Sequence, residues 1–356
     1  QFKKLNNIIG WSVFLIASFV YLSTIEQTVS FWDCGEYIAT AYKLEVGHPP
    51  GAPLFQLFGR IFSLFATPAT SEVAVAINIL SALCSSFTIL FLFWTITAFG
   101  RKLFFKDNDY EVGRIYAVLG AGIVGALAYT FSDSFWFSAV EGEVYAMSSF
   151  FTAITFWCIM KWEQEADQPN ASRWLVLIAY LIGLSVGVHL LSLLTIPAMG
   201  MIYYYKRYEY STVGAIKAFV ISMAILGVVQ GVLIPGAVSL ISTFELFFVN
   251  TIGLPFNSGT IIYFLTIIGA IAYGLSYTKK HNKAVWNTAI LGVMMLLIGY
   301  SSFAILVVRS NANPPIDENN PEDAVGLLSY LKREQYGSWP IVYGQHFNAK
   351  LDSRKP

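Results

Sequence analysis

Long apolar runs are the feature that most restricts how this chain can fold. A helix needs about 20 consecutive apolar residues to cross a bilayer, and the sequence has such runs from residues 8–25 onward. Only 12% of the 356 residues are charged and 56% are hydrophobic, whereas about 25% are charged in soluble domains. The sequence therefore predicts an all-α polytopic membrane protein.

About nine crossings are expected along the chain. They are residues 8–25, 73–99, 114–131, 144–162, two short helices within 174–205, then 217–235, 261–277 and 285–308. The stretch 174–205 is too long for one upright helix and is interrupted by Gly183, Gly187 and His189, so we expect one helix outward and one back, with His189 near the outer turn. Residues 53–65 are too short to cross and fit a helix at the membrane interface, and 239–259 is expected to be a loop containing Glu245.

The basic residues predict the orientation. If the end with Lys3 and Lys4 is cytoplasmic, 14 of the 22 Lys and Arg residues fall on that side, and only Lys43 and Arg60 fall in outer loops before residue 308. This separation is the one that the positive-inside rule requires. Because the chain begins with Gln1, we expect a missing N-terminal piece, and the first run is too long for a cleaved signal.

Two domains are expected. Residues 1–310 form the transmembrane domain, and residues 311–356 begin an extracytoplasmic C-terminal region that is truncated. Within this region Asn320 can cap a helix that starts at Pro321 and runs to about Glu334. Residues 341–343 are typical of a buried strand.

A polar stretch after the first run holds the strongest candidates for chemistry. It comprises Trp-Asp-Cys-Gly-Glu-Tyr at 32–37 and Gly-His-Pro-Pro-Gly at 47–51. Ionisable groups at a membrane boundary are costly and usually functional. Asp33 and Glu36 would share one helix face, and a carboxylate there could act as a base on an acceptor hydroxyl. Asp33 could instead only cap that helix.

A second acidic turn faces the same side. It includes Asp133, Glu141, Glu143 and Tyr145, and if the two acidic loops converge they can form a pocket for a polar substrate. Glu26, Glu45 and Glu72 are interpreted as solvated loop charges.

Three further groups have two interpretations each. His48 could bind a phosphate or only a backbone carbonyl, and His189 could be a core residue or reach the cavity. Arg309 could snorkel to the interface or clamp a lipid phosphate bidentately. A divalent ion between Asp33 and Glu143 is compatible with the acids, but no spacing rule supports it, so we assign no metal ligand.

These motifs resemble those of membrane glycosyltransferases with the GT-C fold, and most closely those of a protein O-mannosyltransferase-like group of bacteria with animal relatives. The resemblance rests on residues 32–36, 47–51, 143–145, 183–189 and 309–315. It implies a GT-C-like bundle of about nine helices with interfacial helices in the first outer loop. Members often carry a large outer C-terminal domain.

The resemblance also implies an activity. It is inverting transfer of a sugar, such as the hexose mannose, from a polyprenyl-phosphate donor to a protein or envelope acceptor. The location would be the periplasmic face of a bacterial inner membrane, with a divalent metal left open as a cofactor and no nucleic-acid partner. The implied catalytic residues are Asp33 and Glu36, and the implied substrate-binding residues are His48, Glu141, Glu143, Tyr145, His189 and Arg309.

Two alternatives of a different class remain: a non-catalytic membrane subunit of a cell-envelope complex, and a transporter. A transporter typically has paired broken helices within an internal repeat. Only 174–205 is broken and no repeat is evident, which argues against the transporter.

Overall fold

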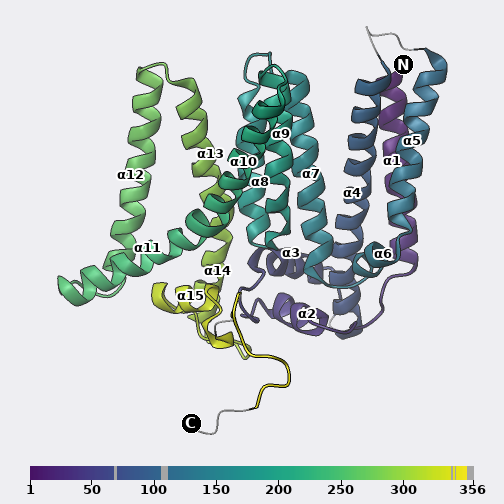
Figure 1. The fold of residues 1–356 in the computed structure, drawn as a ribbon. Coiled ribbons are helices and arrows are strands. Elements are labelled where there is room, and N and C mark those ends of the chain that lie inside the picture. The colour runs from purple at the N-terminus through teal and green to yellow at the C-terminus, as the bar shows by residue number, and fades with distance from the viewer. Residues whose placement is uncertain (68–69, 106–110, 338–339, 341, 351–356) are drawn as a thin grey trace.

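The computed structural model describes residues 1–67, 70–105, 111–337, 340 and 342–350, and helices dominate this part of the chain (Figure 1). In chain order the α-helices are α1 (Phe2–Ser23), α2 (Cys34–Lys43), α3 (Pro53–Ser63), α4 (Thr70–Phe104), α5 (Val112–Thr130), α6 (Asp133–Ala139), α7 (Val144–Glu165), α8 (Ser172–Val186), α9 (Thr195–Arg207), α10 (Thr212–Val228), α11 (Ile234–Leu246), α12 (Ser258–Lys280), α13 (Ala284–Tyr300), α14 (Ala304–Ser310) and α15 (Ala324–Leu331). Short 3-10 or π-helical turns join several of them: η2 (Leu190–Leu194), η3 (Val229–Leu233), η4 (Phe247–Thr251) and η5 (Ser301–Phe303).

The prediction of an all-α polytopic membrane protein is confirmed. Seven helical segments among the described residues are long and apolar enough to cross a membrane. The predicted pair of short helices within 174–205 corresponds to α8 and α9, which are separated by η2 with His189 at its start. The chain is therefore an integral multi-pass membrane protein.

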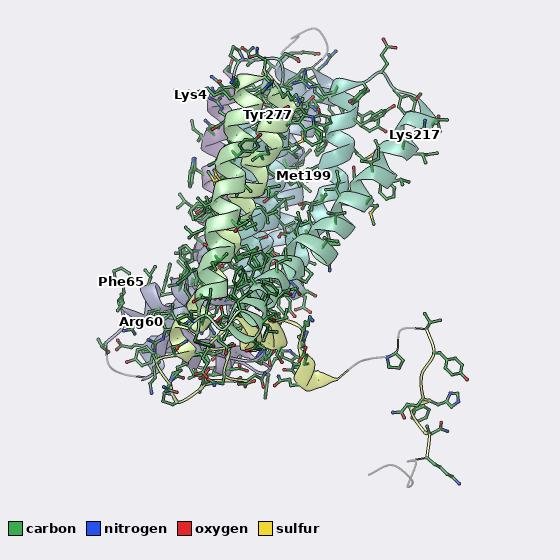
Figure 2. All side chains as sticks on the ribbon, turned by 90° about the vertical axis from the view of Figure 1, so that its left-hand side faces the viewer. Lys4, Arg60, Phe65, Met199, Lys217 and Tyr277 are labelled. Atoms are coloured by element: carbon green, nitrogen blue, oxygen red, sulfur yellow. The ribbon has the colours of Figure 1, made fainter. Side chains whose placement is uncertain are left out.

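The long helices have two chemically different ends. Lys4 and Lys217 lie at one end, which we call the basic end, and Arg60 lies at the other (Figure 2). The short helices α2, α3, α6 and α15 lie across the ends of the long helices, at the end of the bundle opposite the N-terminus (Figure 1). We call this the carboxylate end, because both predicted acidic loops lie there. The predicted interfacial helix at 53–65 is α3.

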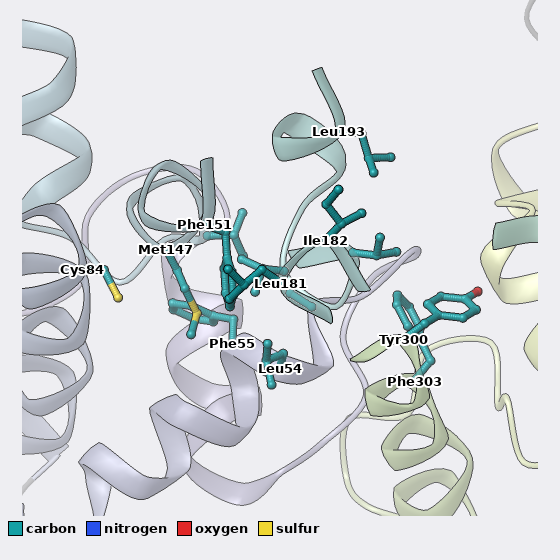
Figure 3. Close-up of a cluster of buried hydrophobic side chains, with 14 of the residues drawn as sticks. Leu54, Phe55, Cys84, Met147, Phe151, Leu181, Ile182, Leu193, Tyr300 and Phe303 are labelled. Carbon is teal, nitrogen blue, oxygen red and sulfur yellow. The ribbon is translucent and has the colours of Figure 1, made fainter. Parts of the chain in front are cut away.

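The core beneath the carboxylate end is built by α3, α7, α8 and η5 (Figure 3). Phe55 of α3 has no exposed surface and packs with Phe151 of α7 in the same cluster as Leu181 of α8. Burying such side chains removes apolar surface from solvent and lipid and holds α3 against the bundle. The main-chain N–H of Leu54 also donates to the Gly187 carbonyl at 2.9 Å.

The predicted loop at 239–259 is wrong over most of its length. The chain is continuously helical from α10 through η4, a segment of 40 residues that ends at Thr251. Glu245 does not need solvent, because its carboxylate accepts main-chain N–H bonds from Asn257 at 2.6 Å and Thr260 at 2.8 Å. It therefore joins α11 to the start of α12 and is only 3% exposed.

Other local expectations also differ from the structure. The predicted turn at 132–143 contains the helix α6, and Glu45, expected to be solvated, is only 3% exposed.

The C-terminal helix starts three residues later than predicted. The side chain of Asp323 caps it by accepting the N–H groups of Val325 and Gly326, so the helix begins at Ala324 and ends at Leu331. Asn320 instead has a φ of +44°. Because the Asp323 carboxylate accepts two main-chain N–H groups, the helix starts after Asp323 and not after Asn320.

The predicted strand at 341–343 is not supported by its described residues. Val342 and Tyr343 are 96% and 93% exposed, and neither forms a strand pair. Ile341 lies outside the described residues. So does Lys106, one of the 14 basic residues that were assigned to the cytoplasmic side. The division at residue 310 stays a prediction, although residues 316–330 pack against the carboxylate end.

Candidate functional site

The two predicted acidic loops meet at the carboxylate end. The Ser30 hydroxyl donates to Glu141 Oε2 at 2.5 Å, and the main-chain N–H of Glu26 donates to the Val140 carbonyl at 3.1 Å. Gly142 allows the close approach, since a Cβ there would lie 2.9 Å from Asn78 Oδ1. The convergence that the sequence predicted is therefore confirmed.

Asp33, Glu36 and His48 form the centre of the site. The main-chain N–H of His48 donates to Glu36 Oε1 at 2.5 Å, and its ring Nδ1 lies 2.9 Å from Glu36 Oε2. The other ring nitrogen, Nε2, lies 3.9 Å from Asp33 Oδ2. The helix α2 supplies both acids at i and i+3, so they share one face, and the Gly-His-Pro-Pro-Gly turn brings the imidazole to them.

The contact between Glu36 and His48 sets the charge of both groups. The hydrogen bond from the His48 ring to Glu36 raises the pKa of His48, and Asp33 adds to this effect. For Glu36, burial works to raise the pKa, but the side-chain and main-chain hydrogen bonds from His48 outweigh it, so the pKa is lowered. Each group therefore favours the charged form of the other, and the His48 ring lies between Glu36 and Asp33.

Asp33 is not used as a structural cap. It occupies the N-cap position of α2, but its side chain accepts no capping hydrogen bond. The side chain is 42% exposed. The preceding residue, Trp32, has a φ of +72°, a left-handed conformation that is uncommon for a bulky residue and often found at functional sites. The cap-only interpretation of Asp33 therefore has no support in the geometry.

Glu143 is a buried acid beside this centre. It is 4% exposed, and its Oε2 has no hydrogen-bond partner among the described residues. Burial raises the pKa of Glu143 to about 7, with further contributions from Asp33 and Glu141. Burial also raises the pKa of Glu141. Glu143 therefore changes charge near neutral pH next to the exposed carboxylate of Asp33.

Aromatic rings connect the remaining predicted residues to the centre. The Tyr37 ring lies 5.7 Å from the His48 ring, measured between centroids. The Tyr145 ring lies 5.4 Å from the His189 ring. Burial raises the pKa of Tyr37, and Glu143, Asp33, Glu36 and Tyr145 are all close enough to add to it. His189 Nδ1 accepts the main-chain N–H of Leu191 at 3.2 Å, which leaves Nε2 uncommitted.

Arg309 lies at the other end of α2. Its Nε donates to the Leu44 carbonyl and its NH2 to the Lys43 carbonyl at 3.3 Å. A ten-residue helix is about 15 Å long, so Arg309 is far from Asp33. Its guanidinium satisfies carbonyls at the C-terminus of α2, which favours a role in holding that helix.

Two residues that the sequence analysis did not single out support the Gly-His-Pro-Pro-Gly turn. The Tyr330 hydroxyl of α15 donates to the Gly47 carbonyl at 2.6 Å. The main chain of Glu318 donates to the Val46 carbonyl at 3.0 Å, where Val46 and Asp317 form a parallel β-bridge. Gly51 has a φ of +70° and would place a Cβ 2.7 Å from the Tyr330 hydroxyl. Nothing local in the sequence marks these partners, which lie more than 250 positions away from the turn.

A cation could bind at the centre. The ligand atoms of Asp33, Glu36 and His48 lie within 4.8 Å of one another, and two carboxylates with one imidazole are acceptable ligands for several divalent metals. Glu36 and His48, however, already satisfy one another. The arrangement fits a metal only if that hydrogen bond is given up.

The fold and the site together define a polytopic membrane protein with a carboxylate–histidine centre at one end of its bundle. Sequence comparison assigns its family: the profile described as "Protein O-mannosyl-transferase TMEM260 N-terminal domain" matches residues 33–212. This range is half of the chain and contains every site residue predicted from the sequence except Arg309. The chain therefore belongs to this protein O-mannosyltransferase-like family.

Individual relatives match over a similar region. The protein named protein O-mannosyl-transferase tmem260 from Dictyostelium discoideum is 29% identical over 195 residues, which are 52% of this chain. The Mus musculus protein of the same name is 26% identical over 176 residues, which are 49% of this chain. The matched part covers 22% of each relative. No solved structure is significantly similar.

Proposed function

We propose that this protein is an inverting glycosyltransferase of the GT-C type that transfers a sugar from a polyprenyl-phosphate donor to a protein hydroxyl. The observation that carries the proposal is the exposed Asp33 carboxylate, held 3.9 Å from a His48 ring that Glu36 fixes in place. The names of the relatives make mannose the first sugar to test. The outer location is supported by the distance of the centre from the basic end.

The reaction requires one base and a path for the leaving phosphate. The acceptor oxygen attacks C1 of the sugar on the face opposite the phosphate, and Asp33 takes the hydroxyl proton. The bond from C1 to the phosphate oxygen breaks, and its electron pair leaves with the polyprenyl phosphate. The His48 ring, which Glu36 holds in place, lies 3.9 Å from the Asp33 carboxylate and positions it for this proton transfer.

The remaining residues bind or position in this proposal. Glu36 orients His48 through two hydrogen bonds. Glu141 and Glu143 form the acidic part of the second loop, and the Tyr145 ring lies 5.4 Å from the His189 ring. Arg309 acts on the site through α2, because its hydrogen bonds go to the carbonyls at the end of that helix.

The test is transfer of labelled mannose from polyprenyl-phosphate mannose to an acceptor peptide by the full-length protein in proteoliposomes. We expect Asp33→Asn to lower kcat by about 100-fold or more, the usual contribution of a general base. Asp133→Asn is the matched control, since Asp133 is an exposed acid at the same end, and we expect it to be neutral. Equal rates for wild type and Asp33→Asn would remove Asp33 from the mechanism.

A further inference from the structure

A large cavity lies at the basic end, on the opposite side of the bundle from the carboxylate centre. Its volume is about 810 Å³, within the usual range for small-molecule sites. It opens between α1, α4, α5 and α7, and it is lined by three cations, Lys3, Arg101 and Lys161, together with three indoles.

The three cations form no ion pair within the part of the chain that the structure describes. At the same end, Lys102 pairs with Glu163 at 2.7 Å and Lys206 pairs with Asp167 at 2.7 Å. By contrast, Lys3, Arg101 and Lys161 form no ion pair with any residue that the structure describes. Positive charges held together without partners favour an anionic ligand.

The one acid on the wall of the cavity is already engaged. Glu165 Oε2 accepts a hydrogen bond from Arg173 at 2.7 Å and another from Trp174 Nε1 at 2.8 Å. Arg173 and Trp174 do not line the cavity. Glu165 is therefore satisfied from outside, and the cavity keeps an excess of positive charge.

The indoles give the cavity a second property. Trp94 contacts Trp11 and Trp157, with ring centroids 6.1 Å and 5.8 Å apart. Lys161 Nζ lies 5.1 Å from the centre of the Trp157 ring, which holds the ammonium at the wall. Two buried polar atoms on the wall, Asn6 Oδ1 and Trp94 Nε1, have no hydrogen-bond partner among the described residues. Buried polar atoms usually find one.

We propose that this cavity binds a phosphate monoester. The guanidinium of Arg101 matches the geometry of phosphate oxygens, and the two ammonium groups balance the remaining charge. The indoles pack on the group attached to the phosphate. The source of the phosphate is a lipid headgroup or a soluble phosphate. This site does not depend on the proposed transferase activity.

The test measures binding of dioleoyl-phosphatidate to the full-length protein in detergent by native mass spectrometry, with dioleoyl-phosphatidylcholine as the reference lipid. We expect phosphatidate to bind at least about tenfold more tightly. Arg101→Gln and Lys161→Gln should each weaken its binding about tenfold, because a charge-assisted hydrogen bond contributes on that scale. Arg101→Lys, which keeps the charge but loses the planar guanidinium, should weaken binding less than Arg101→Gln does.

Lys102→Gln is the matched control, since Lys102 follows Arg101 in α4 but is paired with Glu163 and does not line the cavity. We expect it to leave binding unchanged. Glycerol 3-phosphate distinguishes the source: competition with the lipid supports a soluble phosphate, and failure to displace bound phosphatidate supports a lipid headgroup. Equal binding of the two lipids, or an equal loss in Lys102→Gln, would overturn the proposal. Melting temperatures of the unliganded variants show whether each is folded.

Discussion

At the scale of single residues, the site combines acids in very different surroundings. Asp33 is half-exposed with a 42% exposed side chain, Glu36 is bonded to His48, and Glu143 is buried at 4% exposure. Neighbouring carboxylates in such different surroundings can take different roles in one site.

The buried Glu143 predicts a pH dependence of stability. Burial raises the pKa of Glu143 to about 7, so the folded protein binds this proton more tightly than the unfolded chain does. The stabilisation is complete below the unfolded pKa and is lost as the pH rises through about 7, by about 3 kcal/mol in total. We expect wild type to melt at a lower temperature at pH 8 than at pH 5, and Glu143→Gln to reduce this difference.

Glu26→Gln is the control for this measurement. Glu26 lies in the first loop, and main-chain and side-chain hydrogen bonds from Thr28 lower its pKa. Its charge therefore does not change between pH 5 and pH 8, and the variant should retain the pH dependence of wild type. If Glu143→Gln and Glu26→Gln behave alike, Glu143 is not the titrating group.

At the scale of secondary structure, close helix contacts fix the elements that carry the site. The helices α8 and α13 touch at Gly183, where a Cβ would lie 3.0 Å from Leu296 Cα and would overlap the Leu296 carbonyl oxygen. Small residues allow such close approach between helices in a membrane. The same pair of helices carries the chain to His189 and to Arg309.

Gly183→Ala should therefore force α8 and α13 apart. We expect a loss of about 2 kcal/mol or more, the usual result of overpacking, measured as a lower melting temperature in detergent. Gly120→Ala in α5 is the control, because a Cβ there meets nothing within 4 Å, and its stability should be equal to or slightly above that of wild type. A Gly183→Ala protein as stable as wild type would contradict this helix contact.

At the scale of the whole molecule, the two ends of the bundle have different chemistry. The carboxylate centre lies at one end and the phosphate-binding cavity at the other, so a ligand at either end would be reached from a different side of the membrane. The orientation predicted from the basic residues assigns the cavity to the cytoplasm and the centre to the outer face.

Cysteine labelling in intact cells tests this orientation. The native Cys34, Cys84 and Cys158 are buried and should not react. Ser134→Cys in α6 places an exposed thiol at the carboxylate end. Gln168→Cys, in the turn before α8, places one at the basic end. We expect a membrane-impermeant maleimide to label Ser134→Cys in intact cells and Gln168→Cys only after permeabilisation. The reverse pattern would invert the topology and place the centre on the cytoplasmic side.

The helical fold and the convergence of the two acidic loops could be predicted from the sequence, because both follow from local patterns. Apolar runs of sufficient length form helices in a bilayer, because the main-chain polar groups must be satisfied within the segment. The alternation of basic and acidic loops decides which loops lie on the same side of the membrane. The sequence also identifies Asp33, Glu36, His48 and Glu143 as candidates. An ionisable group beside an apolar run can be recognised in the sequence without knowing which residues it contacts.

The sequence by itself determined the membrane class, the short helices of the first loop and the acids of the site. Only the tertiary structure decided that Glu36 is bonded to His48, that Arg309 holds the end of α2, that Glu245 is buried between helices, and that Tyr330 supports the turn at Gly47. These are contacts between distant segments, and a hydrogen-bond partner is chosen by distance in space. Local periodicity carries no information about that distance.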